Sequence, residues 1–223
     1  MTDPDLKAYI EATKSWRVGN HEKLLSLKKD FGKRVKHVKK RQLEEFALTW
    51  RLPFNPLYLK LGGADIAHTD RKLFDRIKNI LRKRGEGERC WACRRKQQTQ
   101  LKRFAAHEVW AWDDDRGVRR LTAIHFLCED CHYLTHHAYW LFECIPSERD
   151  IRLIRLFCKV NHCTYIEAFA HVKSAMKLCD LRQYGRWKVD LSPISGLIAE
   201  ARKFNRTEPE HRSGLKSIMR AGK

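Results

Sequence analysis

The sequence predicts an α+β fold in which a β-hairpin and the helix after it are held together by four cysteines. Residues 104–112 and 118–127 have the β-branched and aromatic character of strands, with an acidic, glycine-containing turn between them. Residues 132–142 then follow a helical pattern, so the order is strand, strand, helix. Two Cys-X-X-Cys pairs bracket the hairpin, and mainly α-helical segments flank this unit on both sides.

The four paired cysteines have the spacing of a zinc site. Cys90 and Cys93 precede the hairpin, and Cys128 and Cys131 stand at the start of the following helix. Each pair presents two thiolates with the bite that a tetrahedral ion requires, and four thiolates complete a Zn²⁺ shell without an open position. We therefore expect a structural zinc ion that pins the hairpin to the helix. The alternative, four free buried cysteines, is disfavoured by the paired spacing.

The flanking segments follow helical periodicity. Apolar residues recur at three-to-four spacing up to about residue 59, with a break expected near Gly32, and again over residues 71–84. Two further helices are expected over 151–160 and 164–176, the second opened by a capping box of Thr164 and Glu167. The chain is thus divided into a basic helical region (1–84), the zinc module (85–142), a helical extension (143–204) and a loosely ordered charged tail (205–223).

The charge balance indicates a polyanionic partner. The 223 residues include 46 Lys and Arg against 27 Asp and Glu, which gives a formal net charge of +19. A charge of this size favours binding to the phosphate backbone of nucleic acid, although lysine-rich helices can also serve only to solvate a surface. The candidate backbone-binding residues lie in the amino-terminal basic stretch and are Lys28, Lys29, Lys36, Lys39 and Lys40.

The ends and the apolar runs of the chain favour a cytoplasmic location. No apolar stretch of signal-peptide length follows Met1, and none is long enough to span a bilayer. In the reducing cytosol, paired cysteines more often bind metal than form disulfides, which agrees with the zinc interpretation.

A group of histidines lies within this zinc frame. His132 and His136 are four residues apart on the expected helix and so share one face, while His107, followed by Glu108, lies on the first strand. Packing of the hairpin on the helix would bring these four side chains around an ion that keeps open positions for phosphate and water. Such a site supports hydrolysis of a phosphodiester, with the ion neutralising the phosphate and a base activating water.

This segment resembles the HNH nuclease family. The resemblance implies a ββα-metal fold, DNA endonuclease activity and a catalytic divalent ion, Mg²⁺ or Mn²⁺, beside the structural zinc. The residues that carry it are Cys90-X-X-Cys93, His107-Glu108 and Leu127-Cys128-X-X-Cys131-His132-X-X-X-His136. A looser similarity to bacterial stand-alone HNH-like proteins covers His107-Glu-Val-Trp110 and the acidic turn Asp113-Asp-Asp115.

The resemblance leaves the general base open. Most relatives carry a metal ligand followed by a base histidine on the strand, so His107 would be the ligand and Glu108 the base. With the register shifted by one, His107 becomes the base and Ala106 occupies the ligand position. The asparagine that usually begins the second strand is replaced near Ala123, with His125 close by.

Two functions of different classes follow from these observations. The first is an HNH-type endonuclease with a single centre, which would nick one strand per encounter, on its own or as an accessory component of a larger bacterial system. The second is a non-catalytic, zinc-stapled DNA- or RNA-binding module, which explains the charge and the cysteines but gives the histidines no task.

Overall fold

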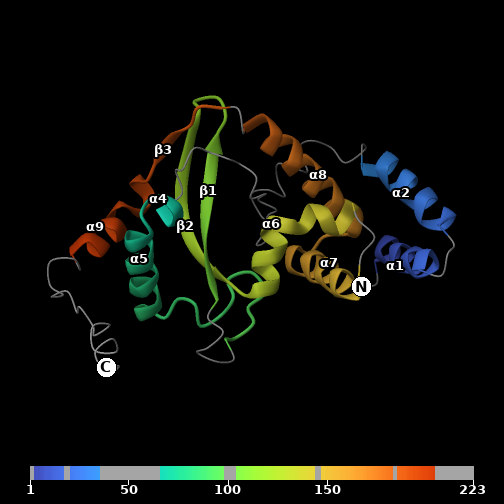
Figure 1. Cartoon of the computed structure of the whole chain (residues 1–223), viewed down its shortest axis with the longest axis horizontal. Helices are drawn as coiled ribbons and strands as arrows, with labels where there is room; N and C mark the ends of the chain where they lie inside the picture. The colour runs from blue at the N-terminus through green and yellow to red at the C-terminus, as the bar shows by residue number, and fades with distance from the viewer. Residues whose placement is uncertain are drawn as a thin grey trace, which may run out of the picture.

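A computed structural model describes residues 3–17, 21–35, 66–97, 104–143, 147–182 and 185–203. It contains helices and a three-stranded sheet of order β1-β2-β3, which confirms the predicted α+β class. The long hairpin stands in the middle of the molecule, with one group of helices on each side (Figure 1). None of the helices among these residues combines the length and apolar character needed to cross a membrane.

The hairpin consists of β1 (Ala105–Asp113) and β2 (Val118–Leu127), paired antiparallel. The turn between them is closed by Asp113, whose carboxylate accepts a hydrogen bond from the backbone N–H of Arg116, and by Gly117 at φ 59°. A left-handed φ of this kind favours glycine. The register sets His107 opposite His125, so these two side chains lie on the same face of the sheet.

The carboxy-terminal extension over 143–204, predicted as mainly α-helical, also adds one short strand to this sheet. Strand β3 (Lys188–Asp190) runs parallel to the start of β2. It is held by the hydrogen bond from the Lys188 N–H to the Gly117 carbonyl, 2.8 Å, and by the Arg120–Asp190 ion pair, 2.6 Å. Three residues are too few to display the alternation that identifies a strand in a sequence.

Helices on one side of the hairpin form an aromatic core. Helix α6 (Glu129–Glu143) follows the hairpin directly, and α7 (Glu148–Asn161) and α8 (Tyr165–Arg182) pack on it. The amino-terminal helices α1 (Pro4–Arg17) and α2 (Glu22–Val35) join this group. The rings that meet there are Tyr9, Phe31, Phe142, Tyr165 and Phe169.

Capping boxes open both of the later helices, α8 at its predicted start and α7 three residues before the predicted start at 151. Thr164 and Glu167 form the expected capping box at α8, with the Glu167 carboxylate 2.8 Å from the Thr164 N–H. A second box, which the sequence prediction missed, opens α7 through Ser147 and Asp150. Each box satisfies backbone N–H groups that have no partner within the helix.

Shorter elements cover the other side of the hairpin (Figure 1). They are α4 (Ile66–Thr69), α5 (Arg71–Lys83), the 3₁₀ turn η1 (Ser192–Ile194) and α9 (Ser195–Lys203). Helix α5 buries the stripe expected from its periodicity, including Leu73 and Ile77, and Gly85 follows its end at φ 85°. An ion pair between Arg84 and Glu200 links α5 to α9.

The amino-terminal prediction needs one correction. The expected break near Gly32 is absent, because α2 continues through this residue to Val35. A glycine in a helix costs about 1 kcal/mol relative to alanine, which the packing of Leu24 and Phe31 in the core can offset. The predictions for 36–65 and for the tail at 205–223 fall outside the described residues.

Candidate metal centres

The first cysteine pair lies in a tight backbone loop. The Cys90 N–H donates to the Arg95 carbonyl, 2.8 Å, and the Arg94 N–H donates back to the Cys90 carbonyl, 2.9 Å. Arg94 adopts φ 61°, a left-handed conformation uncommon for a residue other than glycine. This turn aims both sulfurs of the pair to the same side of the loop.

The second pair lies where β2 passes into α6. Cys128 directly follows the strand and Cys131 stands in the first helical turn. Two contacts tie this junction to the first loop: the Trp91 N–H donates to the Phe126 carbonyl, 2.8 Å, and Arg95 pairs with Asp130, 3.1 Å. A backbone hydrogen bond and an ion pair therefore hold the two cysteine pairs close together.

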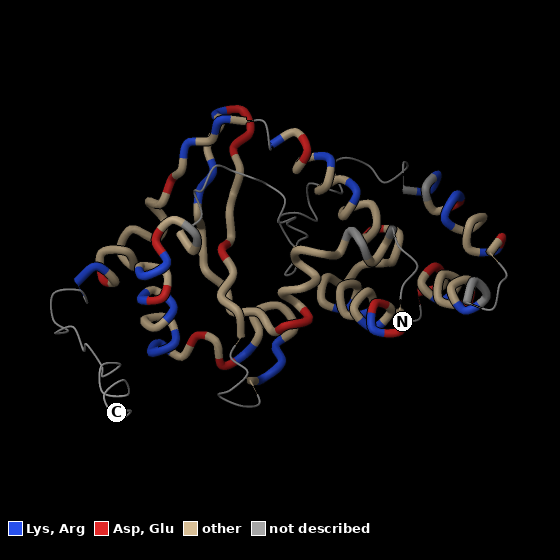
Figure 2. The backbone as a smooth tube through the Cα atoms, in the orientation of Figure 1, with Lys and Arg blue, Asp and Glu red and all other residues tan. Residues whose placement is uncertain are grey.

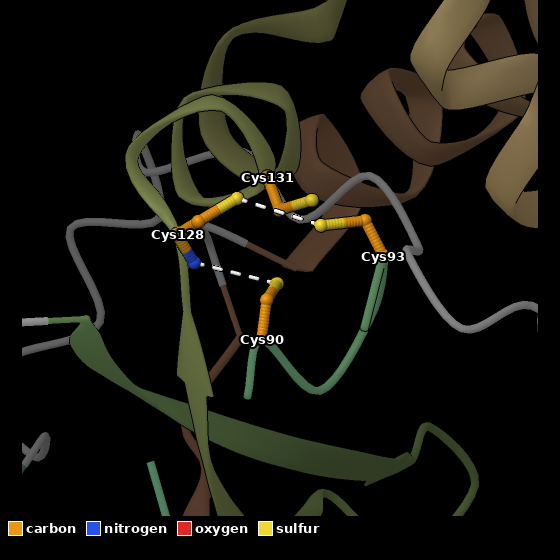
Figure 3. Close-up of side chains that lie close together, drawn as sticks. All are labelled: Cys90, Cys93, Cys128 and Cys131. Atoms are coloured by element: carbon orange, nitrogen blue, oxygen red, sulfur yellow. Dashed lines mark hydrogen bonds between the residues drawn. The ribbon is translucent and has the colours of Figure 1, made fainter. Parts of the chain in front are cut away.

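The four sulfurs form one cluster, as Figure 3 shows, and all lie within 4.8 Å of one another. The Cys93 and Cys128 sulfurs are 3.7 Å apart, close to the spacing of about 3.8 Å that tetrahedral geometry requires for Zn–S bonds of about 2.3 Å. The Cys128 N–H also donates to the Cys90 Sγ, 3.3 Å, as expected for a thiolate ligand. This cluster can hold a zinc ion.

The electrostatics of the cluster favour a cation. Hydrogen bonds from the Cys128 and Cys131 thiols hold the pKa of Cys90 far below its usual range. The pKa of Cys131 is raised, first by its hydrogen bonds to Cys128 and Cys90 and then by burial and their charge. One thiolate therefore forms readily and opposes the ionisation of the next, and only a bound cation lets all four ionise together.

The structure brings three of the predicted catalytic residues together. The ligand nitrogens of His107 on β1 and of His132 and His136 on α6 all lie within 4.8 Å of one another. The ring centroids of His107 and His136 are 4.8 Å apart, as are those of His132 and His136, in edge-on arrangements. The pairing of strand and helix expected from the sequence is thus present in the fold.

The histidine cluster favours neutral imidazoles. Burial first, and then the charges of the neighbouring histidines, lower the pKa of His107 to about 3. Burial also lowers the pKa of His132, with a further contribution from His137. Neutral imidazole nitrogens carry the lone pair that a metal ion needs, so these side chains are prepared to bind a cation at neutral pH.

The donor set of this cluster selects among metal ions. Three imidazoles suit first-row transition metals, whereas Mg²⁺ prefers carboxylates, carbonyls and water. A three-nitrogen site also leaves coordination positions open, unlike the four-sulfur site. Of the two ions expected from the resemblance, Mn²⁺ fits these residues better than Mg²⁺.

Glu108 does not join the histidines, so the prediction of a four-residue cluster is wrong. Its carboxylate accepts hydrogen bonds from the Ala67 N–H, 3.0 Å, and from the Trp110 indole, 3.1 Å. Adjacent residues of a strand point to opposite faces, and Glu108 therefore faces α4 while His107 faces α6. It is buried and ties α4 to the hairpin.

Two further histidines, His125 and His137, lie near the cluster, and the sequence left their roles open. His125 lies opposite His107 and stacks on the Trp91 ring, with centroids 3.9 Å apart and planes at 12°. Burial, with a smaller effect of Arg94, lowers the pKa of His125 to about 4. His137 packs on the Tyr133 ring instead of entering the cluster. The sequence prediction did not include Trp91. Its position between Cys90 and Cys93 is the signal that could have placed it near the metal centres.

The predicted backbone-binding lysines are only partly described. Lys28 is half-buried and Lys29 exposed on α2, while Lys36, Lys39 and Lys40 fall outside the described residues. Figure 2 shows Lys and Arg on helices on both sides of the hairpin, interspersed with acidic residues.

Comparison of the chain with protein-family models, curated proteins and solved structures found no match.

Proposed function

We propose that this protein is a metal-dependent DNA endonuclease of the HNH type, which nicks one strand per encounter. The observation that carries the proposal is the meeting of His107, from the hairpin, with His132 and His136, from the helix that follows it. Helix α6, which carries two of these histidines, also carries Cys131 of the cysteine cluster. A purely structural role for the cysteine cluster would require no second cluster of metal-binding side chains beside it.

The histidines would hold the catalytic ion. When bound, a divalent ion supplies positive charge to the scissile phosphate and to the leaving oxygen. His107, His132 and His136 keep that charge fixed on the hairpin and helix, and their number leaves room for substrate oxygens. The cysteine cluster would hold Zn²⁺ and thereby fix the start of α6, on which two of the three histidines lie.

Because Glu108 lies outside the histidine cluster, it is a poor candidate for the general base that activates water. Its carboxylate is engaged with Ala67 and Trp110, so it is not placed to take a proton from water near the histidines. His125, opposite His107, is the titratable side chain next to the cluster across the sheet. We keep His107, the strand residue of the cluster, as essential to the reaction.

A plasmid-nicking assay with Mn²⁺ tests the proposal. We expect wild-type protein to convert supercoiled plasmid to the open circle, and His107→Ala and His136→Ala each to lower the rate more than about 100-fold. Neither substitution removes a sulfur ligand, so zinc content, folding and DNA affinity should stay close to wild type. His21→Ala is the matched control, because His21 is an exposed histidine that directly precedes α2 and lies outside the cluster.

The same assay separates the endonuclease from the non-catalytic binding module. Both share the net charge of +19 and the cysteine cluster, but only the endonuclease requires the histidines. Cleavage that persists in the His107→Ala, His136→Ala double variant at matched purity would refute the histidine site. Tight DNA binding without any nicking by the wild type would favour the binding module.

A further inference from the structure

Helix α7 carries an exposed row of cations. Arg152, Arg155 and Lys159 are spaced by three and four residues, which places them on one face of the helix, and all three are exposed. The opposite face buries Ile154 and Phe157 in the core. With a rise of about 1.5 Å per residue, the row extends over about 10 Å.

Within the described part of the chain, none of the three side chains of this row pairs with a carboxylate. Arginines elsewhere do so: Arg34 bonds Asp5 through two nitrogens, and Arg182 bonds Asp114 in the same way. The α7 row therefore presents its charge to an external anion.

Arg149, one helical turn before the row, contacts the helix that carries two of the clustered histidines. Arg149, in the first turn of α7, lies 5.5 Å from the centre of the Tyr133 ring and 3.9 Å from the Glu129 carboxylate, both on α6. Tyr133 directly follows His132 in the sequence. A polyanion bound along the row would thus be held next to α6.

We propose that Arg152, Arg155 and Lys159 bind the phosphate backbone of duplex DNA beside the histidine cluster. This inference rests on the proposed endonuclease function and adds the surface along which its substrate lies. Duplex DNA carries a phosphate about every 3.4 Å per strand along its axis, so a row of about 10 Å can reach more than one phosphate of the duplex. Guanidinium groups also bind phosphate oxygens in pairs, which holds the strand in position.

The test is a salt series of binding measurements on a short fluorescent DNA duplex without Mn²⁺. The triple variant Arg152→Gln, Arg155→Gln, Lys159→Gln should lower the slope of log affinity against log salt by about two to three, since each lost phosphate contact removes about 0.9. Glutamine is a good helix former, so the thermal unfolding temperature should not change.

The matched control removes the same charge from the other side of the hairpin. Arg186→Gln, Arg202→Gln, Lys203→Gln also replaces two arginines and one lysine, all exposed and located around β3 and at the end of α9. It should leave the salt slope and the nicking rate near wild type, whereas the α7 variant should lower both affinity and nicking.

The outcomes distinguish this inference from the function on which it rests. A wild-type slope in the α7 variant, with nicking intact, would overturn the row and leave the endonuclease standing. Equal losses in the α7 and control variants would also overturn it, because they would report overall charge alone. A preference for RNA duplex that the α7 substitutions abolish would overturn the assignment to DNA. A wild type that neither binds nor nicks DNA would overturn both.

Discussion

The cysteine cluster and the histidine cluster share the hairpin–helix unit, and Cys131 and His132 are adjacent in the sequence. The two clusters differ in the number of donor atoms and in the elements that supply them. Four sulfurs from a loop and a strand–helix junction can enclose an ion completely, whereas three imidazoles from one strand and one helix cannot. One hairpin–helix unit therefore carries both a four-sulfur cluster, which can enclose an ion, and a three-imidazole cluster, which leaves coordination positions open.

The largest effect is expected from the loss of one sulfur of the cysteine cluster. Cys93→Ser should release the zinc ion and destabilise the hairpin–helix unit by several kcal/mol, because binding of a structural zinc is coupled to folding. Elemental analysis and thermal unfolding measure the two effects. Cys163→Ser is the matched control, since Cys163 is also half-buried but lies outside the cluster. Full zinc content and unchanged stability in Cys93→Ser would remove the structural role.

A second substitution tests the boundary of the histidine site. Glu108→Gln leaves one acceptor oxygen for the two donors, Ala67 N–H and Trp110 Nε1–H, and should cost about 1–3 kcal/mol of stability. Nicking per folded molecule should remain near wild type, because the carboxylate faces away from the histidines. Chemical denaturation and the plasmid assay provide the two readings. Loss of nicking at full stability would return Glu108 to the role of base.

The donors of the histidine cluster also predict which metal ion supports nicking. At equal concentrations, Mn²⁺ should support nicking at least about tenfold better than Mg²⁺, since the cluster offers three imidazoles and Mg²⁺ prefers oxygen ligands. A mild chelator should remove this activity while zinc stays bound to the four sulfurs. Faster nicking with Mg²⁺ would show that oxygen donors outside the histidine cluster dominate the site.

A further prediction separates the clustered histidines from a histidine in the helical flank. His171 is buried on α8, and burial lowers its pKa to about 4. The folded state therefore binds this proton more weakly than the unfolded state, whose histidine pKa is about 6.5. The neutral His171 side chain therefore contributes fully to the free energy of unfolding above about pH 6.5. This contribution is lost as the pH falls toward 4, by less than about 1.4 kcal/mol per pH unit.

His171→Gln should flatten the loss of stability between pH 6.5 and 4, measured by denaturant unfolding with the clusters loaded with metal. The amide can form hydrogen bonds but does not titrate in this range. An unchanged pH profile would assign the acid sensitivity to other groups, among them the histidines of the cluster.

Local sequence signals predicted the elements and the donors. Cys-X-X-Cys spacing identified the four sulfurs, the i to i+4 spacing of His132 and His136 placed both on one helical face, and the capping box of Thr164 began α8. These features depend on neighbours within a few residues, so the sequence carries them directly.

Tertiary structure decided the features that depend on partners distant in the sequence. Glu108 looked like a catalytic neighbour of His107, but the alternation of a strand and the approach of Ala67 turned it to the other face. Strand β3 forms by pairing with the edge of β2, which its own three residues do not predict. The packing of α7 on α6 likewise places the cations of α7 near α6. Local geometry follows from adjacent residues, whereas the face that each side chain shares with others is set by long-range packing.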